Sequence, residues 1–343
     1  MSKFEYNEQY YADVIKQFGY DPLTFDSFDF DIGSITDSEL NMRYLCHQGA
    51  ETYLKTDKAS RLVLTGFGMS GVPHLGSISQ IIRLISFQNA GENCELILGD
   101  LDAYNGRGVA YNEANQLAHR FRSFAIKLGL NKPNASIRIQ SESSSEIKNF
   151  YLLGKYSTDD NLEKYEEDIH DLYVDKGVVH KDLNFPRRMS LMLMVSDFIS
   201  AGQKYDSVMG IIGIDEHKYV LYAKEIQSRM TDNASGLRSD FALSCIYNRL
   251  NKGFGSYPKM SKSFPESGIK VTDSPEKIAR LLRAEPTPPN PYESLIFQLM
   301  IQLHYLSCVD LERMLSVYGT NDWANEIEKF IKFIIGITEL WNQ

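Results

Sequence analysis

The sequence predicts an α/β fold: a doubly wound parallel sheet of the Rossmann-like kind, followed by a small helical region. Three observations lead to this prediction. Short apolar runs recur at 61–66, 94–100, 135–141, 207–213 and 240–247, as expected for strands buried on both faces. Helical segments alternate with these runs, and a glycine-rich turn follows the first of them. Buried strands that alternate with helices form a parallel sheet covered by helices on both faces.

Composition limits the class of protein. The 343 residues are 43% hydrophobic and 24% charged, which allows one large or two modest domains with a sizeable core. The formal charge of −9 argues against a protein that coats nucleic acid through bulk electrostatics, although a local basic patch still permits tRNA binding. No apolar run reaches 18 residues and the N-terminus lacks a signal-peptide core, so we expect no membrane partner.

The four cysteines, Cys46, Cys94, Cys245 and Cys308, are scattered along the chain. They form no CxxC pair, which argues against a zinc site and a disulfide framework. Such cysteine usage fits a reducing compartment, and we expect a cytoplasmic protein. We predict no metal site built from protein side chains.

The pattern predicts three regions. Residues 1–60 form a partly helical extension, with helical spacing at 37–56 and an irregular acidic stretch at 21–33. Residues 61–258 form the α/β domain, with a charged helical insertion at about 142–185 and an apolar helix at 187–201. Residues 259–343 form a loop and a helical C-terminal domain. The other expected helices are 75–87, 110–129, 214–230, 274–284, 291–306, 309–317 and 323–341.

The glycine-rich turn lies where a doubly wound sheet binds a nucleotide. Gly66, Gly68 and Gly71 allow the backbone to approach phosphate, and the next helix offers unpaired N–H groups at its N-terminus. The turn is not the dinucleotide fingerprint, and no Walker A lysine follows it. By itself it therefore does not identify a nucleotide site.

Two further segments indicate what the glycine-rich turn binds. His74-Leu75-Gly76-Ser77 at the helix start resembles the HIGH signature of class I aminoacyl-tRNA synthetases, and Lys259–Ser263 is a complete KMSKS signature after the final strand. Taken alone, His74 is an ordinary polar residue at a helix start and the lysine loop is a solvated surface. Their order along the chain, one after the first strand and the other after the last, favours the functional interpretation.

The resemblance implies a chemistry. In the family, the histidine of HIGH reaches the α-phosphate region, and the two lysines hold the β- and γ-phosphates as pyrophosphate leaves. The attacking group is the carboxylate of the amino acid. We therefore expect His74, Ser77, Lys259 and Lys262 to be catalytic. The cofactors implied are ATP and Mg²⁺ that arrives with it.

Longer segments resemble the tyrosyl/tryptophanyl branch, and the archaeal-type tyrosyl enzymes in particular. They are 66–91, 95–104, 212–226 and 259–282. The resemblance implies a Rossmann-like (HUP-type) catalytic core, a homodimer formed through roughly 110–200, and an amino acid, ATP and the tRNA acceptor stem as partners. It places the following residues at the ATP: Gly66, Phe67, Gly68, Gly76, Gly213, Asp215, Met260, Ser261 and Ser263.

The expected amino-acid pocket departs from the tyrosyl pattern. Leu64 and Ser190 stand where tyrosines are usual, Met194 replaces a glutamine, Asp102 a histidine and Glu216 a glutamine. Ser77 likewise replaces the second histidine of HIGH. Asp197 matches the aspartate that bonds a phenol in tyrosyl enzymes or an indole N–H in bacterial tryptophanyl enzymes. Strict specificity for tyrosine is therefore not expected.

Three functions remain open. The first is a synthetase that charges tRNA with an aromatic amino acid. The second is a synthetase-like paralogue that activates a different amino acid for a biosynthetic pathway, with reduced or no anticodon recognition, which the altered pocket and the acidic terminal helix at 320–343 favour. The third is a non-catalytic binding module, which has no need for both signature lysines.

Overall fold

The computed structural model of the chain describes residues 6–23, 35–158, 162–166, 170–177, 185–232, 234–255 and 257–343. Its centre is a seven-stranded sheet with the order β1-β2-β7-β6-β3-β4-β5. Five strands are parallel: β3 (Arg61–Gly68), β4 (Asn93–Gly99), β5 (Ala135–Ile139), β6 (Ser207–Gly213) and β7 (Ala242–Asn248). The predicted α/β fold with a parallel sheet is confirmed.

The strand order reverses between β3 and β6. The chain proceeds from β3 to β4 and β5 on one side, and continues with β6 and β7 on the other. A crevice opens at the carboxyl ends of the strands at such a reversal, and open α/β sheets bind their ligands there. The glycine-rich turn after β3 lies at this place.

One edge of the sheet is antiparallel, which the sequence analysis did not predict. β2 (Tyr44–Gln48) pairs with β7, and β1 (Asp21–Pro22) pairs with β2. The expected helix at 37–56 is therefore wrong in its middle: α2 (Asp37–Arg43) and α3 (Ala50–Lys55) flank the strand. Hydrogen bonding to β7 decides the conformation of 44–48, and Gly49, at φ 71°, turns the chain into α3. Of the expected irregular stretch, 24–33 lies outside the described residues.

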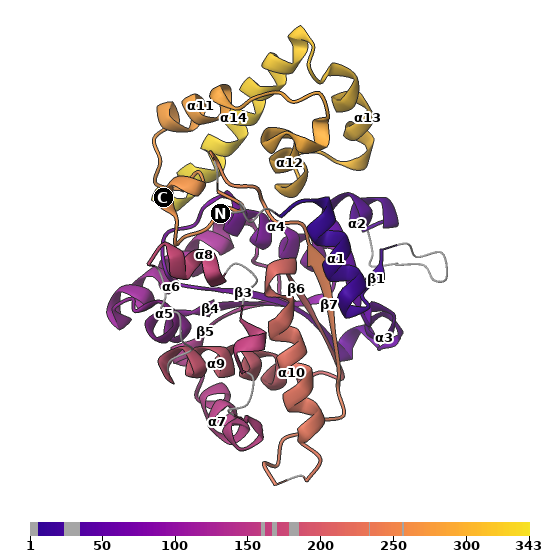
Figure 1. Ribbon diagram of the computed structural model, residues 1–343, viewed down its shortest axis with the longest axis vertical. Helices are drawn as coiled ribbons and strands as arrows, with labels where there is room; N and C mark the ends of the chain where they lie inside the picture. Colours follow the sequence, from indigo (N-terminus) through magenta and orange to yellow (C-terminus); the bar gives the residue numbers. More distant parts are fainter. Residues whose placement is uncertain are drawn as a thin grey trace.

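Helices cover both faces of the sheet and make three layers (Figure 1). α3, α4 (Leu75–Asn89) and α6 (Tyr111–Leu128) pack on one face, where Val63, Leu96 and Ile211 enter a continuous core. The other face carries α1 (Glu8–Phe18), α9 (Phe185–Gly202) and α10 (His217–Arg229), around a second core. The core of each face is apolar, as the unalternating strands predict.

The link between β4 and α6 differs from the expectation. Asp102 was expected at the end of a strand, but the strand ends at Gly99 and Asp102 lies in the short helix α5 (Asp100–Arg107). The carboxylate of Asp100, the first residue of this helix, accepts hydrogen bonds from the backbone N–H of Leu101 (3.0 Å) and of Ser141 (3.1 Å). The bond to Ser141 holds the first turn of α5 against the 3₁₀ turn that follows β5.

The expected helical insertion includes α7 (Ser144–Leu153), a 3₁₀ turn at Leu162–Tyr165 and α8 (His170–Asp175). The parts of the insertion at 159–161, 167–169 and 178–184 lie outside the described residues. The predicted boundaries of the three regions remain predictions.

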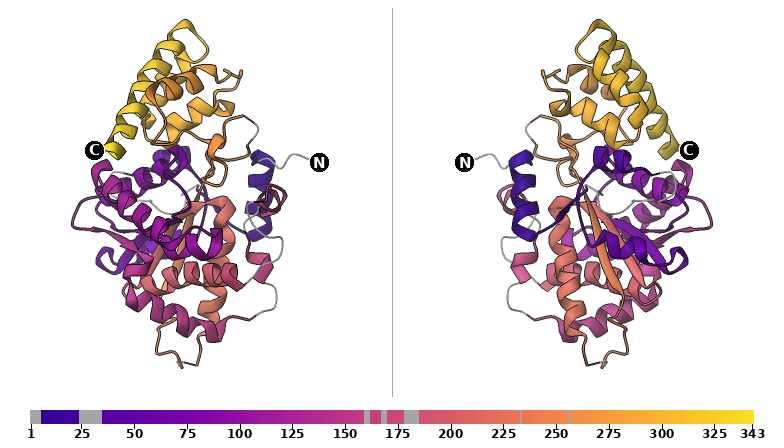
Figure 2. Two further views of the ribbon diagram at one scale, coloured as in Figure 1. Left: turned by 90° about the vertical axis from the view of Figure 1, so that its left-hand side faces the viewer. Right: turned by 90° about the vertical axis from the view of Figure 1, so that its right-hand side faces the viewer.

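The C-terminal helices gather beyond one end of the sheet (Figures 1 and 2). They are α11 (Pro275–Ala284), α12 (Leu295–Gln302), α13 (Cys308–Val317) and α14 (Asn321–Asn342). α12 is shorter than the expected 291–306, because Ser294 caps its N-terminus and a separate 3₁₀ turn occupies Pro291–Glu293. Trp341 of α14 packs edge-on against Phe121 and Phe124 of α6, which attaches this end to the sheet domain. None of the described helices combines the length and the apolarity that a bilayer crossing requires.

Candidate active site

His74 ends the turn after β3 and caps helix α4. Its Nδ1 accepts hydrogen bonds from the backbone N–H of Gly76 (3.1 Å) and of Ser77 (3.4 Å). Because Nδ1 is the acceptor, the proton of the neutral imidazole is on Nε2, which is therefore a donor. Gly76 is required beside it, since a Cβ there would lie 2.8 Å from Cε1 of the ring.

The segment that follows the KMSKS sequence lies against this helix start. The N–H of Leu75 donates to the carbonyl of Ile269 at 3.0 Å, and the N–H of Val271 donates to the carbonyl of Pro73 at 3.0 Å. His74 and Lys270 form an antiparallel bridge between them. Backbone hydrogen bonds thus join the start of α4 to the segment that follows the KMSKS signature, although His74 and Lys270 lie nearly 200 residues apart in sequence.

The two signature lysines enter the same cleft as His74. Nζ of Lys262 donates to the carbonyl of Gly68 at 2.5 Å and lies 4.7 Å from the centre of the Phe67 ring. Nζ of Lys259 pairs with the carboxylate of Asp215, directly after β6. The charge of Lys262 therefore faces the glycine-rich turn, whereas Lys259 is ion-paired beyond the end of β6. The N–H groups expected to be unpaired at the start of α4 are instead bonded to His74 and Ile269.

Burial and these charges act on the titration of the site. Burial, reinforced by Lys262 and Lys259, lowers the pKa of His74 to about 3. Burial also lowers the pKa of Lys262, to about 8, against the raising effect of Glu216 and Asp102. At neutral pH the site therefore holds a neutral histidine beside the ammonium group of Lys262.

The lowered pKa of His74 makes a stability prediction. Below pH 6.5 the unfolded chain takes up a proton on this imidazole, whereas the imidazole of the folded chain stays neutral down to about pH 3. The unfolding free energy therefore has its full value above pH 6.5 and decreases as the pH is lowered below 6.5. Between pH 7.5 and 5 this group alone removes about 2 kcal/mol of unfolding free energy. His74→Asn keeps a capping acceptor but does not titrate. Urea unfolding at the two pH values should therefore show that the variant loses about 2 kcal/mol less unfolding free energy than the unaltered protein. Equal losses would contradict the lowered pKa of His74.

The cleft contains places where only glycine fits and buried oxygens without partners. A Cβ on Gly66 would lie 2.8 Å from the carbonyl oxygen of Ile97, and one on Gly213 would lie 2.5 Å from Oδ1 of Asp215. Oδ1 of Asn248 and of Asn251 is buried and has no hydrogen-bond partner among the described residues. Such oxygens await a donor, and the amino group of an adenine is one. These features fit a nucleotide.

A polar network forms the far end of the cleft. Oγ of Ser190 donates to the carboxylate of Asp102 and approaches its carbonyl oxygen at 3.2 Å. Asp197, 6% exposed, accepts from Nη1 of Arg138 and from Nε2 of Gln140, each at 2.8 Å. Burial raises the pKa of Asp197, and Arg138 and Gln140 oppose that shift. An aspartate on an apolar helix thus has internal partners.

All of the residues predicted from sequence line this one cleft. They are His74, Ser77, Lys259 and Lys262; Gly66, Phe67, Gly68, Gly76, Gly213, Asp215, Met260, Ser261 and Ser263; and Leu64, Asp102, Ser190, Met194, Asp197 and Glu216. Their roles remain predictions.

Comparison with known proteins decides the family. The model of the family described as tRNA synthetases class I (W and Y) matches residues 56–336. The chain belongs to this family. Tryptophan--tRNA ligase of Hyperthermus butylicus is 24% identical over 246 residues, which are 69% of this chain and 61% of that protein. Tyrosine--tRNA ligase of Methanosarcina barkeri is 24% identical over 243 residues, 71% of each chain. Relatives of both specificities thus match, and the chain spans less than two thirds of the Hyperthermus protein.

Solved structures of family members have the same fold. Tryptophanyl-tRNA synthetase of Aeropyrum pernix superimposes with a TM-score of 0.78 at 18% identity, covering 97% of this chain and 93% of that chain. Tyrosyl-tRNA synthetase of Archaeoglobus fulgidus gives 0.66 at 19% identity, covering 90% and 94%. The tryptophanyl and the tyrosyl enzyme thus share the fold of this family member. The fold does not distinguish the two amino acids, so the substrate has to be inferred from the pocket.

Sequence reasoning missed several residues of this synthetase cleft. Those with polar side chains include Gln80, Arg83, Arg107, Gln140, Glu166, Tyr173, Arg187, Asn248 and Asn251. Arg187 and Glu166 form an ion pair through two contacts, of 2.8 and 2.5 Å. Tyr173 of α8 reaches the KMSKS loop: its hydroxyl lies 3.2 Å from Oγ of Ser261 and its ring 5.4 Å from that of Phe264. The pairing of Arg187 with the insertion is non-local, so no pattern in the sequence marks it.

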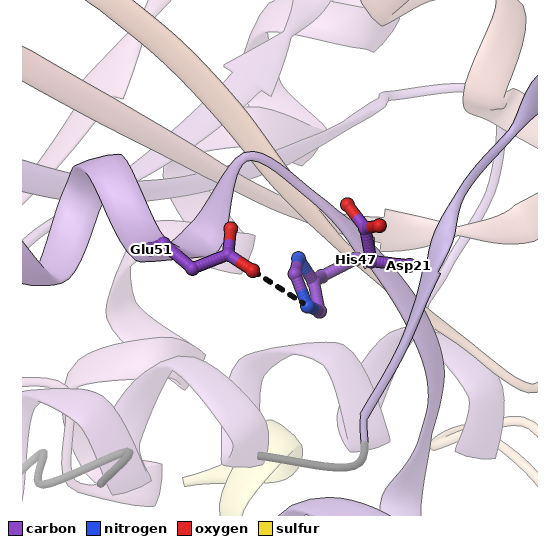
Figure 3. Close-up of side chains that lie close together, drawn as sticks. All are labelled: Asp21, His47 and Glu51. Atoms are coloured by element: carbon purple, nitrogen blue, oxygen red, sulfur yellow. Dashed lines mark ion pairs between the residues drawn. The ribbon is translucent and has the colours of Figure 1, made fainter. Parts of the chain in front are cut away.

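Another polar cluster lies outside the cleft of this family member. Asp21, His47 and Glu51 come together from β1, β2 and α3, and one ligand atom of each lies within 4.8 Å of the others (Figure 3). Nε2 of His47 is 3.7 Å from Oε1 of Glu51, and Asp21 is its cross-strand partner. Burial lowers the pKa of His47, while Glu51 and Asp21 raise it. The cluster connects α3 with the antiparallel edge.

Proposed function

We propose that this chain uses ATP to activate an amino acid as its aminoacyl-adenylate and transfers the aminoacyl group to tRNA. One observation carries the proposal. The start of α4 and the KMSKS loop place a neutral histidine and two lysines around one cleft, and backbone bonds at Leu75 and Val271 hold the segment after that loop against α4. The family to which the chain belongs supports the same activity.

The proposed mechanism assigns each group a task. Nε2–H of His74 donates to the α-phosphate. Because the imidazole is neutral, Nδ1 stays an acceptor for the N–H of Gly76, and this bond orients the ring. Lys262 and Lys259 neutralise the charge that develops on the β- and γ-phosphates as pyrophosphate leaves. The amino-acid carboxylate attacks the α-phosphorus, so no side chain has to act as nucleophile. Mg²⁺ bound to ATP supplies further charge neutralisation on the phosphates.

The adenosine end is proposed to rest on the glycines. Gly66, Gly76 and Gly213 are among the cleft glycines at which a Cβ would meet a neighbouring atom within 2.9 Å. The unpartnered amide oxygens of Asn248 and Asn251 are the acceptors for the base amino group. Ser77, 6% exposed, follows Gly76 at the start of the helix and lines the same cleft.

ATP–pyrophosphate exchange tests the proposal. Purified protein is assayed with each of the twenty standard amino acids, and we expect amino-acid-dependent exchange with at least one large side chain. Labelled amino acid and total tRNA then test the transfer step. Exchange that is absent with every amino acid would refute activation. Exchange without any charging would leave activation standing and refute transfer to tRNA.

The altered pocket favours a second candidate. Leu64 and the Ser190–Asp102 pair replace groups that tyrosyl enzymes use, so the adenylate of another amino acid, made for a biosynthetic pathway, is the alternative product. It shares the ATP chemistry and differs in the second substrate. A cytoplasmic location and a homodimer remain predictions for both candidates.

A further inference from the structure

The floor of the amino-acid pocket is one face of the parallel sheet. Side chains alternate between the faces of a strand, so positions two apart share a face. Leu64 and Gly66 of β3 are paired in register with Glu95 and Ile97 of β4, and Ile97 with Arg138 of β5. This face lies under α9, which contributes Asp197.

Each oxygen of Asp197 accepts one hydrogen bond from a protein donor on this floor. Arg138 donates to Oδ1 and Gln140 to Oδ2, each at 2.8 Å. Arg138 is itself held from the other side by Oε2 of Glu95 at 3.2 Å. Gln140 is fixed too, because its Oε1 accepts the N–H of Asp102 at 3.1 Å. The carboxylate therefore has its charge neutralised and both donors anchored before any substrate enters.

The surfaces around Asp197 are apolar. Leu64, Ile97, Leu191 and Phe198 line the same cleft and are at most 6% exposed, and Met194 lies one helical turn before Asp197 and Phe198. Leu64 carries neither a donor nor an acceptor. A phenol or indole N–H placed beside these side chains meets a carboxylate that is already paired with protein donors, and the Ser190–Asp102 pair is bonded within itself.

We propose that the pocket selects a bulky apolar side chain by size and does not select for a phenol hydroxyl or an indole N–H. Asp197 is then a positioning residue that fixes α9 on the sheet. Leu64, Met194 and Phe198 form the surface that contacts the substrate side chain and limits its size. The inference rests on the proposed activation of an amino acid and names the class of that amino acid.

The physical basis is the size of two kinds of discrimination. A site whose polar groups await a substrate hydroxyl rejects the analogue without it by about 10⁴–10⁵, because the site's groups stay unpaired. An apolar pocket discriminates against an added hydroxyl by only about 10². Asp197 keeps its hydrogen bonds to Arg138 and Gln140 when the ligand is apolar. Binding of phenylalanine therefore leaves neither the carboxylate nor its two donors without a partner.

Exchange kinetics of the unaltered protein test this directly. kcat/KM is measured for tyrosine against phenylalanine, and for tryptophan against 3-(3-benzothienyl)alanine, in which sulfur replaces the indole N–H. We expect phenylalanine to equal or exceed tyrosine, and the tryptophan pair to agree within about tenfold. A preference for tyrosine or tryptophan above about 10³ over its partner would overturn the inference.

A variant releases one oxygen of Asp197. Gln140→Leu removes the donor to Oδ2, and that oxygen then accepts a phenol hydroxyl. We expect the tyrosine-to-phenylalanine ratio of kcat/KM to rise at least about tenfold, whatever the change in overall rate. Gln203→Leu is the control, since Gln203 is a partly buried glutamine of the same region that bonds the carbonyls of Ile199 and Arg238, outside the cleft. An unchanged ratio in Gln140→Leu would refute the occupied-carboxylate explanation.

The two levels of the proposal fail differently. If no amino acid supports exchange, binding of phenylalanine and tyrosine is titrated by calorimetry with ATP present. Binding with the expected preference would refute activation and retain the pocket inference. Strong exchange with tyrosine alone would retain activation and refute the pocket inference.

Discussion

Replacing Lys262 by alanine is expected to lower amino-acid-dependent ATP–pyrophosphate exchange by about 10²–10³-fold. Nζ of Lys262 is fixed between the carbonyl of Gly68 and the ring of Phe67, so its charge is aimed at the phosphate end of the cleft. The charge matters most as pyrophosphate leaves, so the loss should fall mainly on kcat and less on the KM for ATP.

A lysine of the same loop provides the control. Lys252 is exposed and does not line the cleft, so Lys252→Ala should keep exchange within about twofold, as expected for a surface charge that touches no ligand. Lys262→Arg should restore only part of the rate, because the planar guanidinium does not reproduce the compact ammonium. Unchanged exchange in Lys262→Ala would remove the lysine from the proposed mechanism.

Replacing Arg138 by methionine is expected to destabilise the folded protein by about 3–5 kcal/mol, because it leaves two buried carboxylates without their counter-ion. The Arg138 side chain is 10% exposed, and those of its partners Asp197 and Glu95 are 8% and 15% exposed. These carboxylates raise the pKa of Arg138 against the lowering effect of burial. Urea unfolding followed by circular dichroism measures the change.

An exposed ion pair serves as the matched comparison. Arg283 and Glu328 are joined at 2.6 Å, with side chains 57% and 44% exposed. Because solvent screens this pair, Arg283→Met should destabilise the protein far less than Arg138→Met does. Equal effects of the two substitutions would show that Arg138 does not act as a buried counter-ion.

Local patterns accounted for the parallel part of the fold. β3, β4, β6 and β7 are largely buried apolar runs, whereas β5, at the sheet edge, alternates apolar with polar residues. The glycine turn and the HIGH-like helix start mark β3 and α4. The antiparallel edge was missed because 44–48 has no glycine or proline inside it and its conformation depends on pairing with β7, far away in sequence. Helical spacing cannot register such a non-local bond.

The site shows the same division. The proposed ATP end is carried by contiguous signatures, so its residues were named from sequence, whereas Arg138 and Gln140 were missed. A partial signal was present, because Arg138 is a charged residue of β5, Gln140 directly follows that strand, and Asp197 is a carboxylate on an apolar helix. Which of several acidic residues meets them is a tertiary fact that the pattern does not contain.

Tyr173 links the mobility of two segments that sequence treats separately. Its hydroxyl contact with Ser261 and its ring contact with Phe264 make α8 a neighbour of the signature loop at 259–263. The position of the signature loop is therefore set in part by a helix that no signature marks, and a substitution of Tyr173 acts on that loop without touching the signature itself.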